Sequence, residues 1–278
     1  MSKKAFDFVK LEELPPKPRK SGIVEIRGPY YFSVNYGYVE NLLNDWSEYI
    51  DGFKFAGGSQ RLLAREKVKK IIKLCHDHDV YVSTGGFVER VIVQGSKAVD
   101  EYLEECKSLG FDVVEISSGL APIPLEDKVE IVRQVKRLGM DPKPEISMAT
   151  GVGGGTHIAG YEKQIELRSF EDFVDEAETH LKAGADMLMF ESEGVTEDLP
   201  PERWRTDVIK KVVEKFGLGK WMFEAADPVV FKWFLKNFGS DTSLFIDHSQ
   251  IVEYTAWRTG LWGDREIWKG KQLSYKPK

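Results

Sequence analysis

Glutamates stand directly behind short apolar runs at several places in the chain. The clearest are Glu191 in "MLMFESEG" and Glu224 in "WMFEAADP", and Glu115 in "DVVEISSG" follows the same arrangement less tidily. A carboxylate inside a buried strand is costly unless it is paired, protonated or bound to a metal ion. The recurrence therefore indicates a site in which several carboxylates act together.

Other polar residues have the same placement. Glu145 in "KPEIS" and Asp247 in "LFIDHS" follow apolar residues, Lys54 lies between two phenylalanines in "GFKFAG", and Glu25 in "IVEIR" fits the pattern. Side chains alternate across a strand, so these polar residues point to one face while their apolar neighbours point to the other. Like charges a few ångströms apart cannot all stay ionised without compensation, and a divalent cation with oxygen ligands, Mg²⁺ or Mn²⁺, would supply it. The alternative for each residue is an ion pair that only supports the structure.

The elements that carry these residues alternate along the chain. Helix-like stretches, whose apolar residues recur at three- and four-residue steps and several of which end in glycine, separate most of the short apolar runs. From Lys54 to Ser83, Glu115 and Glu145 the steps are 29, 32 and 30 residues, which suits one βα unit each. The expected strands are residues 22–28, 51–58, 80–86, 112–119, 142–148, 186–192, 220–226 and 242–249.

Eight such units predict a single-domain α/β fold, a (β/α)8 TIM barrel. An open doubly wound sheet is the alternative, but the first βα turn lacks the G-x-G-x-x-G fingerprint that would favour it. We expect an N-terminal arm at 1–20, the barrel at 21–263 and a tail at 264–278. In such barrels the C-terminal ends of the strands build the active site, which is where the polar residues fall.

Composition narrows the class of protein. The chain has 278 residues, a net charge of −6 and a sequence pI near 5.6, which argues against a general nucleic-acid binder. Its start has no secretory signal and no stretch approaches eighteen consecutive apolar residues, so neither secretion nor a membrane span is expected. Two cysteines give no disulfide framework. We expect a cytoplasmic protein without nucleic-acid or membrane partners. It could be either a monomer or a homo-oligomer.

Three further stretches could bind an anion or move a proton. "STGG" could present Ser83 and the amides of Gly85 and Gly86 to an anionic group. "GVGGGTH" (151–157) could form an anion-binding nest of backbone N–H groups, or a flexible lid. His248 follows Asp247 at the barrel mouth and is an acid–base candidate, and Ser249 could cap the next helix.

The ordered set of motifs "FKFAGGS", "STGGFVE", "VEISSG", "FESE" and "FEA" resembles the phosphosulfolactate synthase family. The resemblance covers roughly residues 20–263, and "SLFIDHSQ" looks most like the plant heat-stress-associated branch. It implies a (β/α)8 barrel that joins sulfite to phosphoenolpyruvate with Mg²⁺ on the route to coenzyme M. The chain departs from the synthase pattern at Gly57, where that pattern has tryptophan, at Glu193, where it has arginine, and in "FIDH", where it has asparagine.

Two hypotheses follow. The first is a Mg²⁺-dependent lyase acting on a small anionic phosphorylated substrate, with Glu145, Glu191 and Glu224 as metal ligands. Lys54, Glu115 and His248 would then be the catalytic groups. The expected substrate-binding residues are Arg27, Ser83, Gly85, Gly86, Lys143, Asp247 and Ser249. The second hypothesis is a barrel that has lost synthase chemistry, or changed its substrate, and acts as a heat-stress-associated interaction protein.

Overall fold

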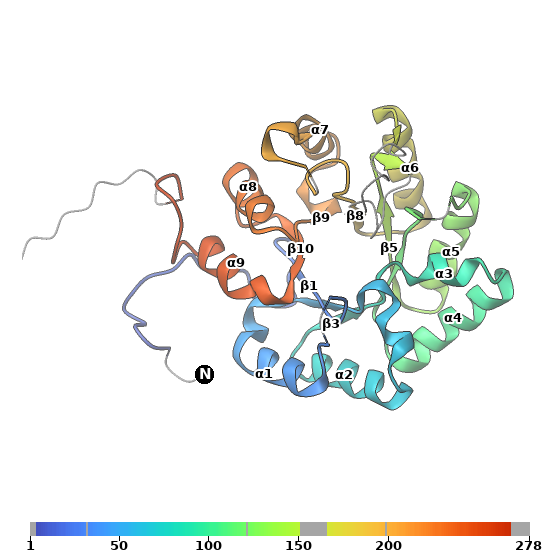
Figure 1. The fold of residues 1–278 in the computed structure, drawn as a ribbon, viewed down its shortest axis with the longest axis horizontal. Coiled ribbons are helices and arrows are strands. Elements are labelled where there is room, and N and C mark those ends of the chain that lie inside the picture. Colours follow the sequence, from blue (N-terminus) through green and yellow to red (C-terminus); the bar gives the residue numbers. More distant parts are fainter. Residues whose placement is uncertain (1–3, 32, 121, 151–165, 198, 268–278) are drawn as a thin grey trace, which may run out of the picture.

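The computed structural model describes residues 4–31, 33–120, 122–150, 166–197 and 199–267 (Figure 1). Eight parallel strands close into a barrel in the order β1-β10-β9-β8-β5-β4-β3-β2. The predicted (β/α)8 barrel is therefore confirmed, and each of its strands falls within, or starts one residue before, a predicted run. The strands are β1 (Val24–Arg27), β2 (Gly52–Lys54), β3 (Tyr81–Ser83), β4 (Val113–Ile116), β5 (Asp141–Ile146), β8 (Leu188–Phe190), β9 (Trp221–Glu224) and β10 (Ser243–Asp247).

Helices surround the barrel and connect its strands (Figure 1). The α-helices are α1 (Tyr36–Trp46), α2 (Arg65–Asp77), α3 (Val88–Ile92), α4 (Ser96–Leu109), α5 (Leu125–Arg137), α6 (Phe170–Ala183), α7 (Thr206–Phe216), α8 (Pro228–Phe238) and α9 (Ile251–Arg258). Short 3₁₀ turns are η1 (Ser47–Tyr49), η2 (Ala56–Leu62), η3 (Gly85–Phe87), η5 (Pro201–Arg203), η6 (Leu218–Lys220) and η7 (His248–Gln250). In the described residues no helix is both long and apolar enough to cross a membrane.

The main core lies between the strands and the helices. Phe53, Val114 and Phe223 are fully buried there, on the strand face opposite to Lys54, Glu115 and their equivalents. A smaller apolar cluster is formed by Met189, Met222 and Phe245 on the strands β8, β9 and β10. This separation follows from side-chain alternation: the outward face packs on helices, and the inward face carries the charged residues together with this small cluster.

A short hairpin extends the chain after β5. Its strands β6 (Ala149–Thr150) and β7 (Glu166–Leu167) pair antiparallel and belong to a separate two-stranded sheet, which the sequence did not predict. The predicted "GVGGGTH" stretch lies outside the described residues, between these two strands.

A buried ion pair ties the N-terminal arm to the barrel at the N-terminal ends of the strands. Arg19 Nη1 lies 2.8 Å from Asp51 Oδ1, and both side chains are buried. The other oxygen of Asp51 accepts a hydrogen bond from the Val24 N–H at 2.8 Å. Asp51 therefore joins the arm to β1 just before β2 begins.

Helices α5 and α6 are joined by a buried ion cluster. The Glu176 carboxylate of α6 accepts hydrogen bonds from the Lys128 ammonium of α5 and, at 2.6 Å, from Arg168 Nη1, and His180 lies beside it. Burial alone would raise the pKa of Glu176, but His180, Lys128 and Arg168 lower it to about 2. Glu176 is therefore ionised in the folded protein at neutral pH, and its negative charge contributes to the stability of the fold.

This lowered pKa predicts acid sensitivity. An ordinary glutamate titrates in the unfolded chain near its reference value, so the stabilisation by Glu176 is complete above that pH and is lost as pH falls toward 2. We expect Glu176→Gln to cost about 2 kcal/mol at pH 7 and clearly less at pH 3. Urea unfolding at both pH values measures this, and an equal cost at both would contradict the assignment.

Candidate active site at the mouth of the barrel

A cavity of about 400 Å³ opens at the C-terminal ends of the strands. Seven glutamates and three basic residues line it, so the cavity is strongly acidic. The charged residues of the lining are Arg27, Lys54, Glu89, Arg90, Glu115, Glu145, Glu191, Glu193, Glu197 and Glu224, and the others include Tyr30, Tyr31, Gly57, Gly85, Gly86 and Ser117. The strand-end carboxylates that the sequence singled out are thus gathered in one place.

Four buried charges alternate beneath the cavity, and we call them the interior ring: Glu25, Lys54, Glu115 and Lys143. Lys54 Nζ lies 2.6 Å from Glu115 and 3.9 Å from Glu25. Lys143 Nζ lies 2.6 Å from Glu25 and 3.3 Å from Glu115. Each lysine therefore touches both carboxylates, and the ring as a whole is neutral. Only Lys54 and Glu115 also line the cavity.

The interior ring keeps Lys54 charged. Burial alone would lower the pKa of the Lys54 ammonium, but Glu115 and Glu25 raise it above its usual range. Burial would likewise raise the pKa of Glu115, and Lys54 and Lys143 lower it. The Lys54 ammonium also lies 3.9 Å from the centre of the Phe245 ring. Lys54 is therefore a fixed cation that can stabilise negative charge, and a poor base.

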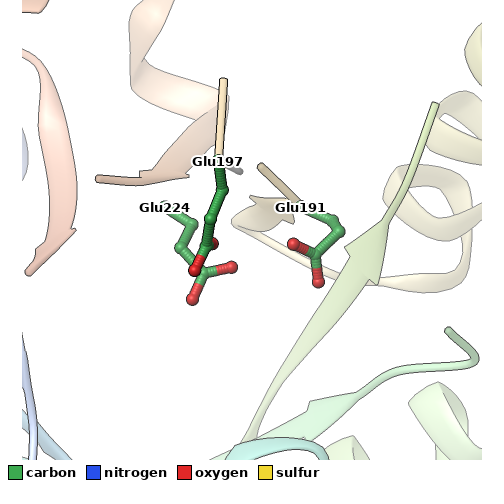
Figure 2. A group of neighbouring side chains, drawn as sticks. All are labelled: Glu191, Glu197 and Glu224. Carbon is green, nitrogen blue, oxygen red and sulfur yellow. The ribbon is translucent and has the colours of Figure 1, made fainter. Parts of the chain in front are cut away.

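Three carboxylates converge on the opposite wall of the cavity. Glu191, Glu197 and Glu224 each offer an oxygen, and these oxygens lie within 4.8 Å of one another (Figure 2). Glu145 lines the same cavity but is not part of this group. Glu191 follows β8 and Glu224 ends β9, so two neighbouring strands place two of the three carboxylates.

The turn after β8 places the third carboxylate. The backbone N–H groups of Val195, Thr196 and Glu197 all donate to the Ser192 carbonyl, at 3.0, 2.9 and 3.1 Å. Ser192 Oγ donates in turn to the Glu197 carboxylate at 2.7 Å. The chain therefore folds back on itself, and this turn brings the Glu197 side chain close to the C-terminal end of β8.

Crowding shifts the titration of these acids. Burial and the neighbouring Glu224 raise the pKa of Glu191 well above its usual range, and the same two causes raise that of Glu197 to about 7. Burial and Glu115 raise the pKa of Glu145 in the same direction. Without a counter-charge, part of this wall therefore carries protons at neutral pH.

The carboxylate group fits a hard divalent cation. Octahedral Mg²⁺ holds oxygens at about 2.1 Å, so its ligand oxygens stand roughly 3 to 4 Å apart, and it keeps several water ligands. Oxygens within 4.8 Å of one another reach such a geometry with small side-chain movements. The residues that would hold the ion are Glu191, Glu197 and Glu224.

Arg27 crosses the cavity between aromatic rings. Its Nη2 donates to Glu224 at 3.2 Å, and its guanidinium carbon lies 5.2 Å from the centre of the Tyr31 ring and 5.3 Å from that of Phe245. Burial lowers the pKa of Arg27 and Glu224 raises it, with a net rise. A planar cation held this way suits a carboxylate or phosphate of a substrate.

Tyr30 explains the glycine at position 57. Gly57 has a φ of +57°, and a Cβ there would lie 2.3 Å from the Tyr30 ring. An aromatic ring from the loop after β1 thus fills the space beside the loop after β2. A tryptophan at position 57, which the synthase pattern has in place of this glycine, would require Tyr30 to move.

Two glycines let the loop after β3 approach the interior ring. A Cβ on Gly85, whose φ is +61°, would lie 2.7 Å from the Phe55 carbonyl, and one on Gly86 would lie 2.4 Å from Ser117 Oγ. Glu89 fastens the same loop to the next one, because it accepts hydrogen bonds from Ser117 Oγ at 2.5 Å and from the Leu120 N–H at 2.8 Å.

Five of the predicted site residues are absent from the lining of this cavity: Ser83, Lys143, Asp247, His248 and Ser249. Asp247 accepts hydrogen bonds from the Ser249 N–H and hydroxyl at 3.0 and 2.5 Å and caps the start of η7. His248 Nδ1 lies 2.6 Å from the Tyr38 hydroxyl, and burial lowers its pKa. Ser83 is fully buried beside Lys54 in the register, and Lys143 belongs to the interior ring.

Sequence reasoning missed Glu197, Glu89 and the tyrosines at 30 and 31. Glu197 lies six residues beyond Glu191 in a turn, so no strand periodicity marks it. The tyrosines stand in "GPYYF" directly after β1, and adjacent aromatics beside a predicted barrel mouth are the signal that could have found them.

The chain is similar in sequence to two kinds of known protein. The chain is 36% identical over 256 residues to Protein HEAT-STRESS-ASSOCIATED 32 of Arabidopsis thaliana, with 88% of each chain covered. It is 28% identical over 240 residues to the phosphosulfolactate synthase of Methanocaldococcus jannaschii, covering 82% of this chain and 88% of that protein.

A solved structure shares the fold. N-acetylneuraminate lyase from Mycoplasma synoviae superimposes with a TM-score of 0.50 at 14% identity, covering 89% of this chain and 76% of that one. The sequence pattern of the family described as (2R)-phospho-3-sulfolactate synthase (ComA) matches residues 12–264. This match contains every strand of the barrel, and the chain belongs to the (2R)-phospho-3-sulfolactate synthase family.

Proposed function

We propose that this protein is a Mg²⁺-dependent carbon–sulfur lyase that adds sulfite, or a related nucleophile, to phosphoenolpyruvate or a similar small phosphorylated acid. The observation that carries the proposal is one cavity in which Glu191, Glu197 and Glu224 face the fixed cations Lys54 and Arg27. Mn²⁺ could replace Mg²⁺, since both prefer oxygen ligands.

Different residues of the chain would have different roles in such an addition. The sulfur lone pair would form a bond to C3 of the acid, the double-bond electrons would move to C2 and the carboxylate, and C2 would take one proton. Lys54 and Arg27 would stabilise the negative charge that develops on the carboxylate. A divalent ion bound by the three glutamates would supply Lewis-acid stabilisation of the same charge.

The proton would come from a nearby acid, because Lys54 holds its own proton too firmly. We assign this role to Glu145, because it lines the cavity and because burial and Glu115 raise the pKa of its carboxyl group well above the usual range, which favours the protonated form. The phosphate would lie toward Arg90 and the Gly85–Gly86 turn, on the side of the cavity away from the carboxylate group.

The direct test mixes the purified protein with phosphoenolpyruvate, sulfite and Mg²⁺ and follows the reaction by phosphorus NMR. We expect a new phosphate-ester signal that disappears when the metal is chelated. No new signal at millimolar substrate and micromolar protein would overturn this substrate pair. Repeating the assay with Glu193→Arg, which restores the arginine of the synthase pattern, would then show whether Glu193 is the reason.

A second candidate is an interaction protein without synthase activity. It is favoured by the 36% identity to a heat-stress-associated plant protein and by Glu193 at the cavity, which adds negative charge where phosphate and sulfite would bind. A ligand that binds only the folded state must raise its unfolding temperature. An unfolding temperature that Mg²⁺ and phosphoenolpyruvate leave unchanged would favour this candidate.

A further inference from the structure

A second cavity, of about 1070 Å³, lies between the loop after β1 and the helix α2, and we call it the outer groove. Tyr30 and Tyr31 line both the outer groove and the cavity at the barrel mouth, so the two adjoin each other. The other large apolar or aromatic residues of its lining are Val34, Tyr36, Leu62, Leu63, Ile71 and Leu74.

Several apolar side chains of the outer groove are in contact with solvent. Leu62 is 88% exposed, and Tyr30, Tyr31 and Tyr36 are also exposed. These residues lie together around one groove and are not scattered singly over the surface. A contiguous exposed apolar patch of this kind commonly marks a site where another molecule binds.

The outer groove is also basic, although the whole chain has a net charge of −6. Lys67, Lys70 and Lys73 of α2 line it, and Asp77 is the one acidic residue of its described lining. Lys73 is paired with Asp77 at 2.5 Å, whereas Lys67 and Lys70 are exposed and form no ion pair within the part of the chain that the structure describes. The groove therefore presents two positive charges without a partner beside an apolar surface.

A second exposed apolar patch lies on the N-terminal arm, in residues 5–14, which we call the arm segment. Phe6 and Phe8 are 75% and 76% exposed, and their rings meet edge to face with centroids 6.2 Å apart. Val9 and Leu11 are exposed as well. Phe6 has a φ of +55°, a backbone conformation that bulky residues rarely adopt. The chain thus holds two phenylalanine rings in solvent at a cost in backbone strain.

The arm segment is held on its own barrel near both ends. Lys4 Nζ lies 2.5 Å from Glu48 and 2.6 Å from the Tyr49 hydroxyl, and the Glu12 N–H donates to the Thr259 carbonyl at 3.0 Å. Figure 1 shows the arm, in blue, looping out from the barrel beside α9. No residue of the arm segment lines the outer groove of the same chain. Within one copy, both apolar patches therefore stay uncovered.

The arm segment and the outer groove have opposite charges. The arm segment has three carboxylates and one lysine, which gives a formal charge of −2. The described lining of the outer groove has three lysines and one aspartate, which gives +2. Complementary charge of this kind speeds the encounter of two surfaces and fixes how they align.

The possible contact area is sufficient for a reversible dimer. A buried phenylalanine removes roughly 150 Å² of its surface from solvent, so the two rings of one arm and the groove that covers them would bury about 600 Å² together. Two such contacts, one for each arm, would bury about 1200 Å², which is the lower limit for most specific interfaces. One contact alone would not reach that limit.

We propose that the arm segment of one copy of this protein binds in the outer groove of a second copy, and that the exchange is reciprocal and forms a dimer. Phe6 and Phe8 pack on the apolar lining of the groove, and the carboxylates of the arm segment lie toward Lys67 and Lys70. This inference does not depend on the reaction that takes place in the cavity at the barrel mouth.

The dimer contact also bears on the candidate active site. Tyr30 and Tyr31 belong to both cavities, and the guanidinium carbon of Arg27 lies 5.8 Å and 5.2 Å from the centres of their rings. The arm of the second copy therefore packs against the outer side of the aromatic residues that hold Arg27 in place.

Sedimentation velocity of the full-length protein at rising concentration tests the proposal. Wild type is expected to dimerise reversibly. Phe6→Ala combined with Phe8→Ala should raise the dissociation constant about tenfold or more, since the two rings supply most of the buried apolar area. Val93→Ala combined with Val229→Ala is the matched control, because both valines are exposed and lie outside the arm segment and the outer groove. We expect it to dimerise like wild type.

Reversal of charge tests whether the two surfaces touch. Glu12→Lys with Glu13→Lys should weaken the dimer, and so should Lys67→Glu with Lys70→Glu. All four changes together should restore it, because the two surfaces again have opposite charges. All of these side chains are exposed, so the variants should fold, and circular dichroism spectra like that of wild type would show that they do.

Three outcomes would overturn the inference. The first is a wild type that stays monomeric at about 100 µM, a concentration at which even a weak specific interface should form. The second is a dimer that the variant of Phe6 and Phe8 forms as tightly as wild type. The third is a fourfold charge reversal that dimerises no better than either pair of changes alone.

Discussion

Replacing Lys54 with methionine should lower kcat/KM by at least 100- to 1000-fold on the true substrate. Loss of one preorganised donor to a developing anion commonly costs that much. Lys54 lies in the interior ring and lines the cavity, so its ammonium is the buried cation best placed to meet the substrate. Steady-state kinetics with saturating Mg²⁺ measures the effect.

The same substitution should also destabilise the protein. Methionine has a similar length but no charge, so Glu25 and Glu115 would be left with only Lys143 between them. Leaving a buried carboxylate without its partner costs about 3 to 5 kcal/mol. Urea unfolding of the purified variant measures the loss.

A double substitution separates the two effects. In Lys54→Met combined with Glu115→Gln the ring is neutral again, because Lys143 and Glu25 remain as one pair. We expect the double variant to recover much of the stability and none of the activity. If Lys54→Met alone retained wild-type activity, the role given to Lys54 would be wrong.

Glu197→Gln should make the metal-free protein more stable at pH 8 and remove its response to Mg²⁺. The pKa of Glu197 is about 7 in the folded state because of burial and Glu224, against an ordinary value of 4.5. Below the ordinary value both states are protonated and the group has no effect. As pH rises toward 7 the unfolded chain ionises first, and folding loses up to about 3 kcal/mol.

Glutamine removes this loss because it does not ionise. At pH 8 we therefore expect the metal-free variant to be about 2 to 3 kcal/mol more stable than wild type, and at pH 4 to be nearly equal to it. Mg²⁺ at 100 times its dissociation constant should stabilise wild type by about 2.7 kcal/mol and leave the variant nearly unchanged. Thermal unfolding of wild type and variant at pH 8 and pH 4, with and without Mg²⁺, measures these differences in stability.

Glu202→Gln is the matched control, because Glu202 lies in η5 on the surface and outside the cavity. It removes one carboxylate from the same part of the chain and should change neither the pH dependence nor the effect of Mg²⁺. An equal Mg²⁺ response in Glu197→Gln and wild type would show that the ion, if it binds, does so without this carboxylate.

The barrel could be predicted because two independent patterns agree. Glu115 lies between Val114 and Ile116 in the sequence, and the structure places these two apolar side chains in the outer core while Glu115 joins the interior ring. The even spacing of the βα units fixed the strand order, since a closed parallel barrel pairs each strand with its sequence neighbour.

The members of the site that lie on turns could not be predicted in the same way. Glu197 reaches the cavity because three backbone N–H groups converge on one carbonyl, which is a property of the folded turn and not of residue spacing. The hairpin of β6 and β7 has only two residues in each strand, too few for a periodic signal.

Residue type alone also left some roles unresolved. Asp247 stands at a strand end like Glu224, yet its carboxylate accepts hydrogen bonds from Ser249. An aspartate before a 3₁₀ turn is a good N-cap, and a sequence does not show whether the same oxygen also faces a cavity. The glutamates, whose side chains are longer by one methylene, extend further from the strand ends.

The neutrality of the interior ring restricts how this protein can change over time. Glu25, Lys54, Glu115 and Lys143 come from four different strands, yet a single replacement that alters the charge of any one of them leaves a buried charge uncompensated. Viable descendants should therefore exchange these residues in oppositely charged pairs, or pass through an intermediate that folds poorly. Lineages that abandon catalysis would still inherit the ring, so its presence in a relative reports ancestry and folding rather than activity.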